Sequence, residues 1–328
     1  MIKEIDLMTA QTDNVYFDNS MLEAFRACPR KFYFRHVRDW EFASPKVALS
    51  FGSAWHSSMD VIWKGATIKD KTVLYKDACA AFLNVWVETG MTLDDGTLMT
   101  LYPRTPGRAF EMLHHYLETY YDRIKDYEIL GIEQPFVIPL TDGSDNIFYM
   151  GRLDKIWRDK GRVYIADHKT TGSDKSSWLE SFTPNNQVDG YLCAGYMTYG
   201  DAFWGLIIDG ALVQKGSKAI PPYPAGIAFP RIPVQRLFGH IESWRWETLY
   251  SINLVKENFR LLEESKISGC DFMMAFPKNT TACSHYGSCI YRYVCKMIVN
   301  PLRMEDAPEG FKVSKWSPMK GEENGASE

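Results

Sequence analysis

Residues 147–169 read IFYMGRLDKIWRDKGRVYIADHK, in which two apolar runs flank the pair Lys160-Gly161. Two such runs with a glycine between them predict an antiparallel β-hairpin that turns at this pair. Residue numbers of facing positions then sum to 321, so Asp154 faces Asp167. Directly opposed side chains lie about 5 Å apart at Cβ. The stretch therefore predicts two neighbouring strands that present two carboxylates on one patch.

A cation is needed where these carboxylates meet, because two opposed carboxylates repel each other. Lys169 lies two residues after Asp167 and so points to the same face. A divalent metal with oxygen ligands is the natural occupant, and Lys169 would orient a water or stabilise developing charge. An ordinary cross-strand salt bridge is the alternative interpretation, and a bulge would shift the register. The acid-x-Lys pattern is not diagnostic alone, because residues 264–266 repeat it on an expected helix without a partner acid.

Two helical patterns lie on either side of the hairpin in the sequence. Residues 51–56 read FGSAWH and begin an expected helix that continues to about Gly65. Gln187 and Tyr191 are four residues apart, so they share one face of an expected helix over 183–199. Each pattern alone is explained by packing, and their meaning depends on their order around the hairpin.

Taken in order, these motifs resemble the RecB-type branch of the PD-(D/E)XK nuclease superfamily. That branch has a Gly-x-x-x-His helix, a Gly-x-x-Asp strand, an Asp-x-Lys strand and a Gln-x-x-x-Tyr helix. This chain matches them, between about Tyr16 and Cys295, with Gly52 and His56, Gly151 and Asp154, Asp167 and Lys169, and Gln187 and Tyr191. No residue of this set departs from the pattern, so the resemblance implies an active enzyme.

The resemblance also implies a fold and roles for the site residues. The fold is restriction-endonuclease-like α/β, with a central mixed sheet flanked by helices. The implied ligands of Mg²⁺ or Mn²⁺ are His56, Asp154, Asp167 and the backbone carbonyl of His168. Lys169 would position the attacking water or stabilise the phosphate, and Gln187 and Tyr191 would orient Lys169 or contact the DNA backbone.

The activity implied is that of a metal-dependent DNA exonuclease in end processing, repair or recombination. One alternative is a DNA-end-binding or partner-activated subunit without stand-alone activity, working with a helicase, a recombinase or another phage or prokaryotic DNA-processing protein. A zinc-stabilised hydrolase acting on RNA is another. We find no Walker phosphate loop, so no built-in ATPase is expected.

Seven cysteines give a second signal: Cys28, Cys79, Cys193, Cys270, Cys283, Cys289 and Cys295. Because the sequence shows neither a secretory signal nor a transmembrane run, we expect a cytoplasmic protein, in which structural disulfides are rare. The last three cysteines form Cys-x5-Cys-x5-Cys, which suggests a metal centre lacking a fourth ligand. Cys79, Cys193 and Cys270 are isolated in the sequence and are expected in the core. Buried free thiols remain the alternative for the trio, and His285 is a competing ligand.

The fourth ligand could be Cys28, within residues 25–32, FRACPRKF. This segment resembles the N-terminal helix of iron–sulfur nucleases of the RecB, AddB and CRISPR-associated exonuclease group, in which one early Cys joins three late ones around a 4Fe–4S cluster. The late trio there usually reads Cys-x2-Cys-x5-Cys, so the first gap here departs from it. Four thiolates suit a 4Fe–4S cluster or tetrahedral zinc. The resemblance favours a structural cluster that joins the N- and C-terminal segments.

The charge of the chain does not indicate a polyanionic partner, since 328 residues carry a net charge of −4. A DNA-binding protein would then have to concentrate its basic residues locally. One expected helix does so with Arg26, Arg30, Lys31 and Arg35, which alternate with aromatic residues on which bases would stack. The alternative is an amphipathic helix with its aromatic residues in the core.

The element pattern predicts one nuclease domain over residues 16–304. A helical insertion is expected over 66–128, a cysteine region over 270–300 together with Cys28, and a disordered tail over 305–328. Ser20 and Glu23 form a capping-box pattern that predicts one helix to about Val37. Glu133, in an expected strand before the hairpin, matches a frequently acidic position of these nucleases or is a surface residue.

Overall fold

The computed structural model describes residues 14–44, 46–142, 146–173, 176–216, 222–284 and 288–315. These residues form two compact units. The first combines Met1–Ser44, Val137–Gly151 and Phe238–Glu328, and the second combines Pro45–Phe136 and Arg152–Leu237.

The second unit is built on a mixed sheet, as the sequence predicts. β4, whose first residues belong to the first unit, pairs antiparallel with β5, and β5 pairs parallel with β6. β3 pairs with β4, while β7 and β8 run antiparallel to β6. The strands are β3 (Glu128–Pro139), β4 (Ile147–Asp159), β5 (Arg162–Thr171), β6 (Phe203–Val213), β7 (Ile227–Ala228) and β8 (Arg231–Val234).

The predicted hairpin register is confirmed. Every facing pair from Lys155 with Ala166 to Asp159 with Arg162 sums to 321. The turn residues Lys160 and Gly161 have φ angles of 48° and 80°. Positive φ at both central residues is what a type I′ turn requires, and this turn matches the right-handed twist of the strands.

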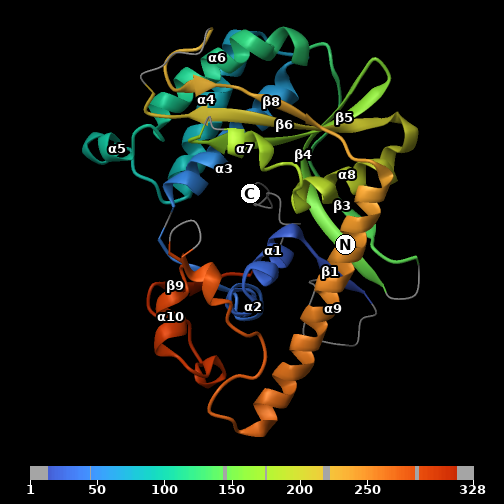
Figure 1. Cartoon of the computed structure of the whole chain (residues 1–328). Coiled ribbons are helices and arrows are strands. Elements are labelled where there is room, and N and C mark those ends of the chain that lie inside the picture. The colour runs from blue at the N-terminus through green and yellow to red at the C-terminus, as the bar shows by residue number, and fades with distance from the viewer. Residues whose placement is uncertain are drawn as a thin grey trace, which may run out of the picture. The chain divides into compact units, whose positions relative to one another are not determined.

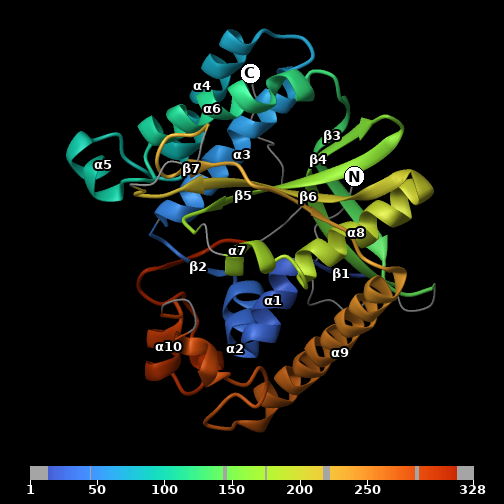
Figure 2. The same cartoon turned by 45° about the horizontal axis from the view of Figure 1, so that its top comes forward.

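Helices cover both faces of this sheet. α3, α4 and α6 lie on one face, and α7 and α8 on the other (Figures 1 and 2). Large apolar side chains of the first group, such as Trp55, Phe82 and Trp86, are fully buried in one core with the sheet. The helices are α3 (Val47–Gly65), α4 (Lys71–Glu88), α5 (Asp95–Leu101), α6 (Pro106–Ile124), α7 (Ser176–Glu180) and α8 (Asn186–Tyr199). The expected helical insertion over 66–128 thus contains α4, α5 and α6.

The first unit brings early and late segments together (Figure 1). β1 pairs parallel with the start of β4, and β2 pairs antiparallel with β9. Its elements are β1 (Val15–Phe17), α1 (Asn19–Ala27), α2 (Pro29–Phe32), a π-helix (Tyr33–Val37), β2 (Trp40–Phe42), α9 (Phe238–Ser268), α10 (Arg292–Met297) and β9 (Phe311–Val313). The sequence places a disordered tail from residue 305, whereas β9 is paired; residues 316–328 lie outside the described residues.

The N-terminal helix differs from the expected one. Its cap is Asp18, whose side chain accepts a hydrogen bond from the backbone N–H of Met21 at 2.9 Å, so the Ser20 capping box is wrong. The helix ends at Ala27 because Cys28 is extended, with φ of −163°, and Pro29 begins α2. A residue before proline is disfavoured in the helical region, and proline is well suited to the first helical turn.

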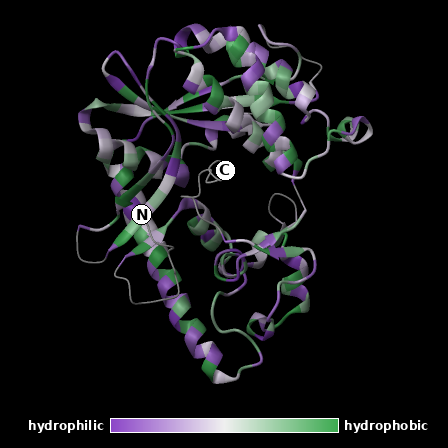
Figure 3. Ribbon diagram, turned by 180° about the vertical axis from the view of Figure 1, so that it is seen from behind, coloured by the Kyte–Doolittle hydropathy of each residue, from purple (hydrophilic) through white to green (hydrophobic). Residues whose placement is uncertain are grey.

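The long helix α9 has one buried stripe. Figure 3 shows hydrophobic and hydrophilic residues alternating along it. Ile241, Trp244, Ile252 and Val255 are buried at helical spacing, which is the pattern of a helix with one face in the core.

Candidate functional site

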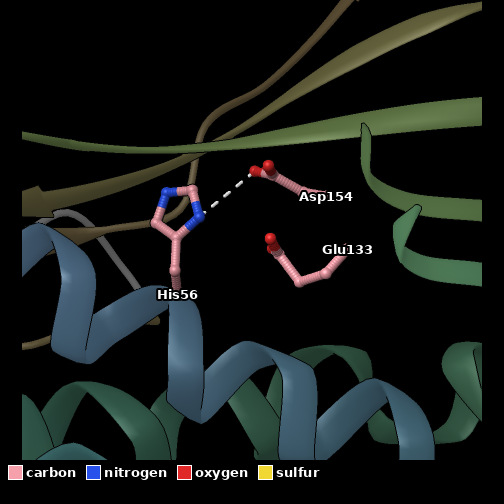
Figure 4. A group of neighbouring side chains, drawn as sticks. All are labelled: His56, Glu133 and Asp154. Carbon is pink, nitrogen blue, oxygen red and sulfur yellow. Dashed lines mark ion pairs between the residues drawn. The ribbon is translucent and has the colours of Figure 1, made fainter. Parts of the chain in front are cut away.

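Three side chains of the second unit converge between α3, β3 and β4 (Figure 4). His56 comes from α3, Glu133 from β3 and Asp154 from β4, and their ligand atoms all lie within 4.8 Å of one another. His56 Nδ1 is 3.3 Å from Asp154 Oδ2. One nitrogen and two carboxylate oxygens at this spacing suit a divalent cation such as Mg²⁺ or Mn²⁺.

The peptide of His168 holds two of these ligands in place. Its N–H donates to Asp154 Oδ2 at 2.7 Å, and its carbonyl lies 2.7 Å from His56 Nε2. Because a carbonyl oxygen only accepts, Nε2 carries a proton, and Nδ1 is the ring nitrogen that faces Asp154. The resemblance assigns the His168 carbonyl to the metal, and in this structure that oxygen accepts a hydrogen bond from His56 Nε2.

Glu133 is a member of the site that the sequence left open. Its φ is 51°, an uncommon value for a non-glycine residue in a strand, and such strain concentrates at functional sites. Burial, followed by the charges of Asp154 and Asp60, raises the pKa of Glu133 to about 7. Arg152 Nη1 lies 3.5 Å from its carboxylate. In the sequence, only its position as an acidic residue before the hairpin pointed to the site. A strand pattern does not show that the residue has a positive φ.

Asp167 and Lys169 form an ion pair next to this trio. Lys169 Nζ is 3.0 and 2.8 Å from the two carboxylate oxygens of Asp167. Asp167 is only 2% exposed, and this burial raises its pKa; Lys169 opposes the shift and Asp154 adds to it. The structure therefore brings together the acids and the lysine of the hairpin, with Asp167 paired to Lys169 instead of belonging to the close trio.

The side chain of His168 points away from this pair into the core. It is fully buried, with Nδ1 3.6 Å from Asp209 Oδ2 and its ring against Trp63. Burial, then the charge of Lys155, lowers the pKa of His168 well below its ordinary value, so the ring is neutral. Its role is structural, because it anchors the peptide that positions His56.

Gln187 and Tyr191 lie on α8 and contact each other. Gln187 Nε2 donates to the Tyr191 hydroxyl at 3.1 Å, and the Tyr191 ring packs edge-on against Phe136. Between them on the helix, Asp189 pairs with Arg236 at 2.7 Å. This buried pair joins α8 to the segment that follows β8.

The cysteines of the expected metal centre lie in the first unit. The backbone N–H of Asn279 donates to Cys28 Sγ at 3.3 Å, and that of Cys289 donates to the Cys283 carbonyl at 3.0 Å. Burial raises the pKa of the Cys295 thiol to about 11, a shift that Arg30 opposes and that Cys28 and Cys289 increase. All four cysteines are half-buried, and His285 lies outside the described residues.

Three arginines of the basic segment, which the sequence assigned to DNA binding, make hydrogen bonds within the protein. Arg26 donates to Ser251 and Thr248, Arg30 to the Phe276 carbonyl, and Arg35 to the Ser314 carbonyl; Lys31 is exposed. The interspersed aromatic residues Phe25, Phe32, Tyr33 and Phe34 are buried, so bases cannot stack on them. The alternative interpretation, an amphipathic helix with its aromatic residues in the core, fits the structure.

Comparison with known proteins gives a match along most of the chain. The model of a family described as the PD-(D/E)XK nuclease superfamily matches residues 19–296. No curated protein matches. Eleven chains of solved structures match, among them the crystal structure of SSO0001, with 15% identity over 74% of this chain and 78% of that one. Its TM-score of 0.29 is too low to carry an argument. Among the described residues, no helix is long and apolar enough to cross a membrane.

Proposed function

Because this chain belongs to the PD-(D/E)XK nuclease superfamily, we propose that it is a metal-dependent DNA exonuclease that processes DNA ends and carries a structural 4Fe–4S cluster. Members of this superfamily are mostly nucleases that use divalent metals. The observation that carries the proposal is the convergence of His56, Glu133 and Asp154 beside the Asp167–Lys169 pair.

The metal would be held by His56 Nδ1 and by the carboxylates of Glu133 and Asp154. These residues fit a cation, because Nδ1 and two partly desolvated carboxylates face one another at close range. A bound Mg²⁺ or Mn²⁺ supplies Lewis-acid stabilisation of phosphate oxygens and makes water a better nucleophile at neutral pH. The resemblance also assigns Asp167 to the ligands, whereas in this structure its carboxylate is paired with Lys169.

Lys169 supplies the positive charge on the reacting phosphate. Its ammonium is held by Asp167, so it is fixed before substrate arrives, and fixed charge stabilises a transition state without reorganisation. Positioning of the attacking water is the alternative role of Lys169. Gln187 and Tyr191, on the same side of the sheet, would contact the DNA backbone or restrain Lys169.

The proposed cluster would be held by four thiolates, which are the usual ligands of a 4Fe–4S cluster. The four thiols come from the start of α2 and from the segment around α10, and Cys28 Sγ already accepts a backbone N–H. Arg30 is 4% exposed, and burial lowers its pKa, while the nearby Cys295 and Cys28 oppose this shift. Four thiolates suit a 4Fe–4S cluster or tetrahedral zinc, and the resemblance to iron–sulfur nucleases favours the cluster.

The test is digestion of end-labelled single- and double-stranded DNA with Mg²⁺, with Mn²⁺ or with EDTA. Wild type is expected to cleave only with metal, and the label position gives the polarity. Asp167→Ala is expected to lose cleavage by at least 100-fold while remaining folded. Glu264→Ala is the matched control, because it alters the acid of the second acid-x-Lys triplet, which lies exposed on α9.

Three results would redirect the proposal. Metal-independent binding of DNA ends by an intact protein, with no cleavage, favours a DNA-end-binding module. Cleavage that begins only when a helicase or recombinase is added favours a partner-activated subunit. Faster cleavage of a matched RNA strand favours an RNA hydrolase.

A further inference from the structure

Trp178 of α7 is an aromatic residue that the proposed chemistry does not use. It is partly exposed, on a short helix whose other residues are all exposed. Its ring packs edge-on against the buried Phe182, with ring centroids 5.1 Å apart. Its carbonyl accepts hydrogen bonds from the backbone N–H of Ser181 at 3.2 Å and from the Ser181 hydroxyl at 2.6 Å. These contacts hold Trp178 in place and leave it partly accessible to solvent.

The indole of Trp178 lies over Gly210 of β6. A Cβ on Gly210 would be only 2.7 Å from Trp178 Cη2, so the absence of a side chain lets the ring approach the strand this closely. In the parallel register of β5 and β6, Gly210 is the partner of Lys169. Paired residues of neighbouring strands lie about 5 Å apart. The indole is therefore next to the strand position that carries Lys169.

The alternation of side chains along β5 places Trp178 on the reacting face. His168 is paired with Asp209 in the same register, and their side chains approach to 3.6 Å in the core. Lys169 is the next residue, so it points to the opposite face, together with its ion-pair partner Asp167. Because Gly210 follows Asp209, the indole over Gly210 lies on the Lys169 face.

A partly exposed indole beside a phosphate-binding ammonium suits nucleic acid. Bases stack on aromatic side chains whatever their sequence, while Lys and Arg meet the phosphates. The aromatic residues of the N-terminal basic segment are buried and cannot serve in this way. Trp178 combines an accessible ring, a fixed position and a cationic neighbour within the second unit.

We propose that Trp178 is the stacking platform for the base of a nucleotide that adjoins the phosphate bound at Lys169. The indole holds this nucleotide by its base, and the ammonium holds it by charge. The inference rests on the proposed function, since it takes Lys169 to lie at the reacting phosphate. Trp178 is a substrate-binding residue and takes no part in bond cleavage.

The first test measures binding of single-stranded oligonucleotides, because a base must be unpaired to lie on the indole. 2-Aminopurine, whose fluorescence falls on stacking, is placed in turn at each of the last few nucleotides of either end, with Ca²⁺ replacing Mg²⁺ to slow cleavage. Wild type is expected to quench the probe at one position. Trp178→Ala is expected to lose this quenching and to bind about five- to 150-fold more weakly, the range for one lost base–aromatic stack.

The second test separates stacking from a purely structural role of Trp178. An abasic site at the quenched position removes the base, so wild type is expected to bind this oligonucleotide as weakly as Trp178→Ala binds the intact one. The abasic site should cost Trp178→Ala little more, because the base and the indole form one interaction and their losses do not add. In the digestion assay Trp178→Ala should raise KM and leave kcat and the affinity for Mn²⁺ nearly unchanged.

Two further variants serve as controls. Trp178→Phe keeps an aromatic ring and is expected to retain most of the binding. Trp204→Ala removes a tryptophan that is 45% exposed on the same strand as Gly210. At a rise of about 3.3 Å per residue it lies roughly 20 Å from Gly210, so this variant is expected to change nothing.

The outcomes separate the inference from the proposed function. DNA binding by wild type without quenching, undiminished quenching in folded Trp178→Ala, or equal losses from the abasic site in both proteins would overturn the inference while metal-dependent cleavage persists. A wild-type chain that neither binds nor cleaves DNA contradicts the proposed function and the inference together.

A variant that fails to fold does not end the test. If Trp178→Ala does not fold, Trp178→Leu, which is apolar and lacks a ring, takes its place. Should neither fold, wild type is photocrosslinked to an oligonucleotide with 5-iodouracil at the quenched position. An adduct on Trp178 supports the inference, and an adduct on another residue contradicts it.

Discussion

The backbone peptide of His168 holds two side chains of the site in position. His56 and Asp154 are linked through one peptide, that of His168, which donates to one and accepts from the other. A change that shifts this peptide moves both ligands together. The identity of His168 matters little to the metal, because its ring is buried in the core on the opposite face.

The raised pKa of Glu133 predicts a pH-dependent stability in the metal-free protein. Its folded pKa of about 7 exceeds the ordinary 4.5, so between these values the folded state binds a proton that the unfolded state has lost. Stability therefore falls as pH rises through this window, by on the order of 2 kcal/mol. Urea unfolding in EDTA at pH 5 and pH 8 measures the loss, and Glu133→Gln is expected to reduce it.

The affinity for Mn²⁺ is also expected to depend on pH, because the ion competes with the proton on Glu133. Mn²⁺ must displace it below pH 7, so the affinity of wild type is expected to rise up to tenfold per pH unit toward neutrality. Glu133→Gln should bind Mn²⁺ more weakly and with a flatter pH profile. An unchanged slope in this variant would assign the proton to another group.

At the scale of elements, the hairpin was predictable and the N-terminal helix was not. Strand alternation and Lys160-Gly161 determine the register locally, so Asp154 and Asp167 could be placed from the sequence. The pattern of residues 19–37 is typical of one continuous helix, but Pro29 makes Cys28 extended, so the helix is interrupted there. The metal trio was predictable only in part, since Glu133 reaches it through a left-handed backbone angle that tertiary packing imposes.

The hairpin turn supports a prediction of its own. Gly161 has a φ of 80°, and a Cβ there would meet nothing within 4 Å, so Gly161→Ala costs only backbone strain. The expected loss in the free energy of unfolding is about 1–2 kcal/mol. Gly107→Ala is the control: its Cβ is equally free, its site is in α6 without a positive φ, and it is expected to be neutral or stabilising. Urea unfolding of both variants checks the difference, and equal losses would contradict the turn assignment.

At the scale of the whole molecule, the first unit depends on segments from both ends of the sequence. β2 pairs with β9, and the Asn279 N–H reaches Cys28. Arg26 and Arg35 were expected from the sequence to bind DNA. In the structure they form hydrogen bonds to the late segments of this unit, Arg26 to Ser251 and Arg35 to the Ser314 carbonyl. Sequence alone could not show this, because a guanidinium suits a carbonyl oxygen as well as a phosphate.

The cysteine centre is expected to stabilise this unit without taking part in cleavage. Cys28→Ser should lose the visible iron–sulfur absorbance and several kcal/mol of stability, because ligand loss removes a link between distant segments. The Mn²⁺ site of the second unit should still bind its ion. Cys270→Ser, which alters an isolated cysteine of the same unit, serves as control. Colour and iron content that survive in Cys28→Ser would exclude this residue as a ligand.

The pairing of early and late segments has a consequence for synthesis on the ribosome. Cys28 is translated 255 residues before Cys283, and all of Pro45–Phe136 and Arg152–Leu237 is translated between them. At about 5–20 residues per second, Cys28 waits on the order of ten to fifty seconds for its partners. The second unit is thus able to fold while the first unit is still incomplete, and in the proposed iron–sulfur protein the delivery of iron and sulfide would be the last step in maturation.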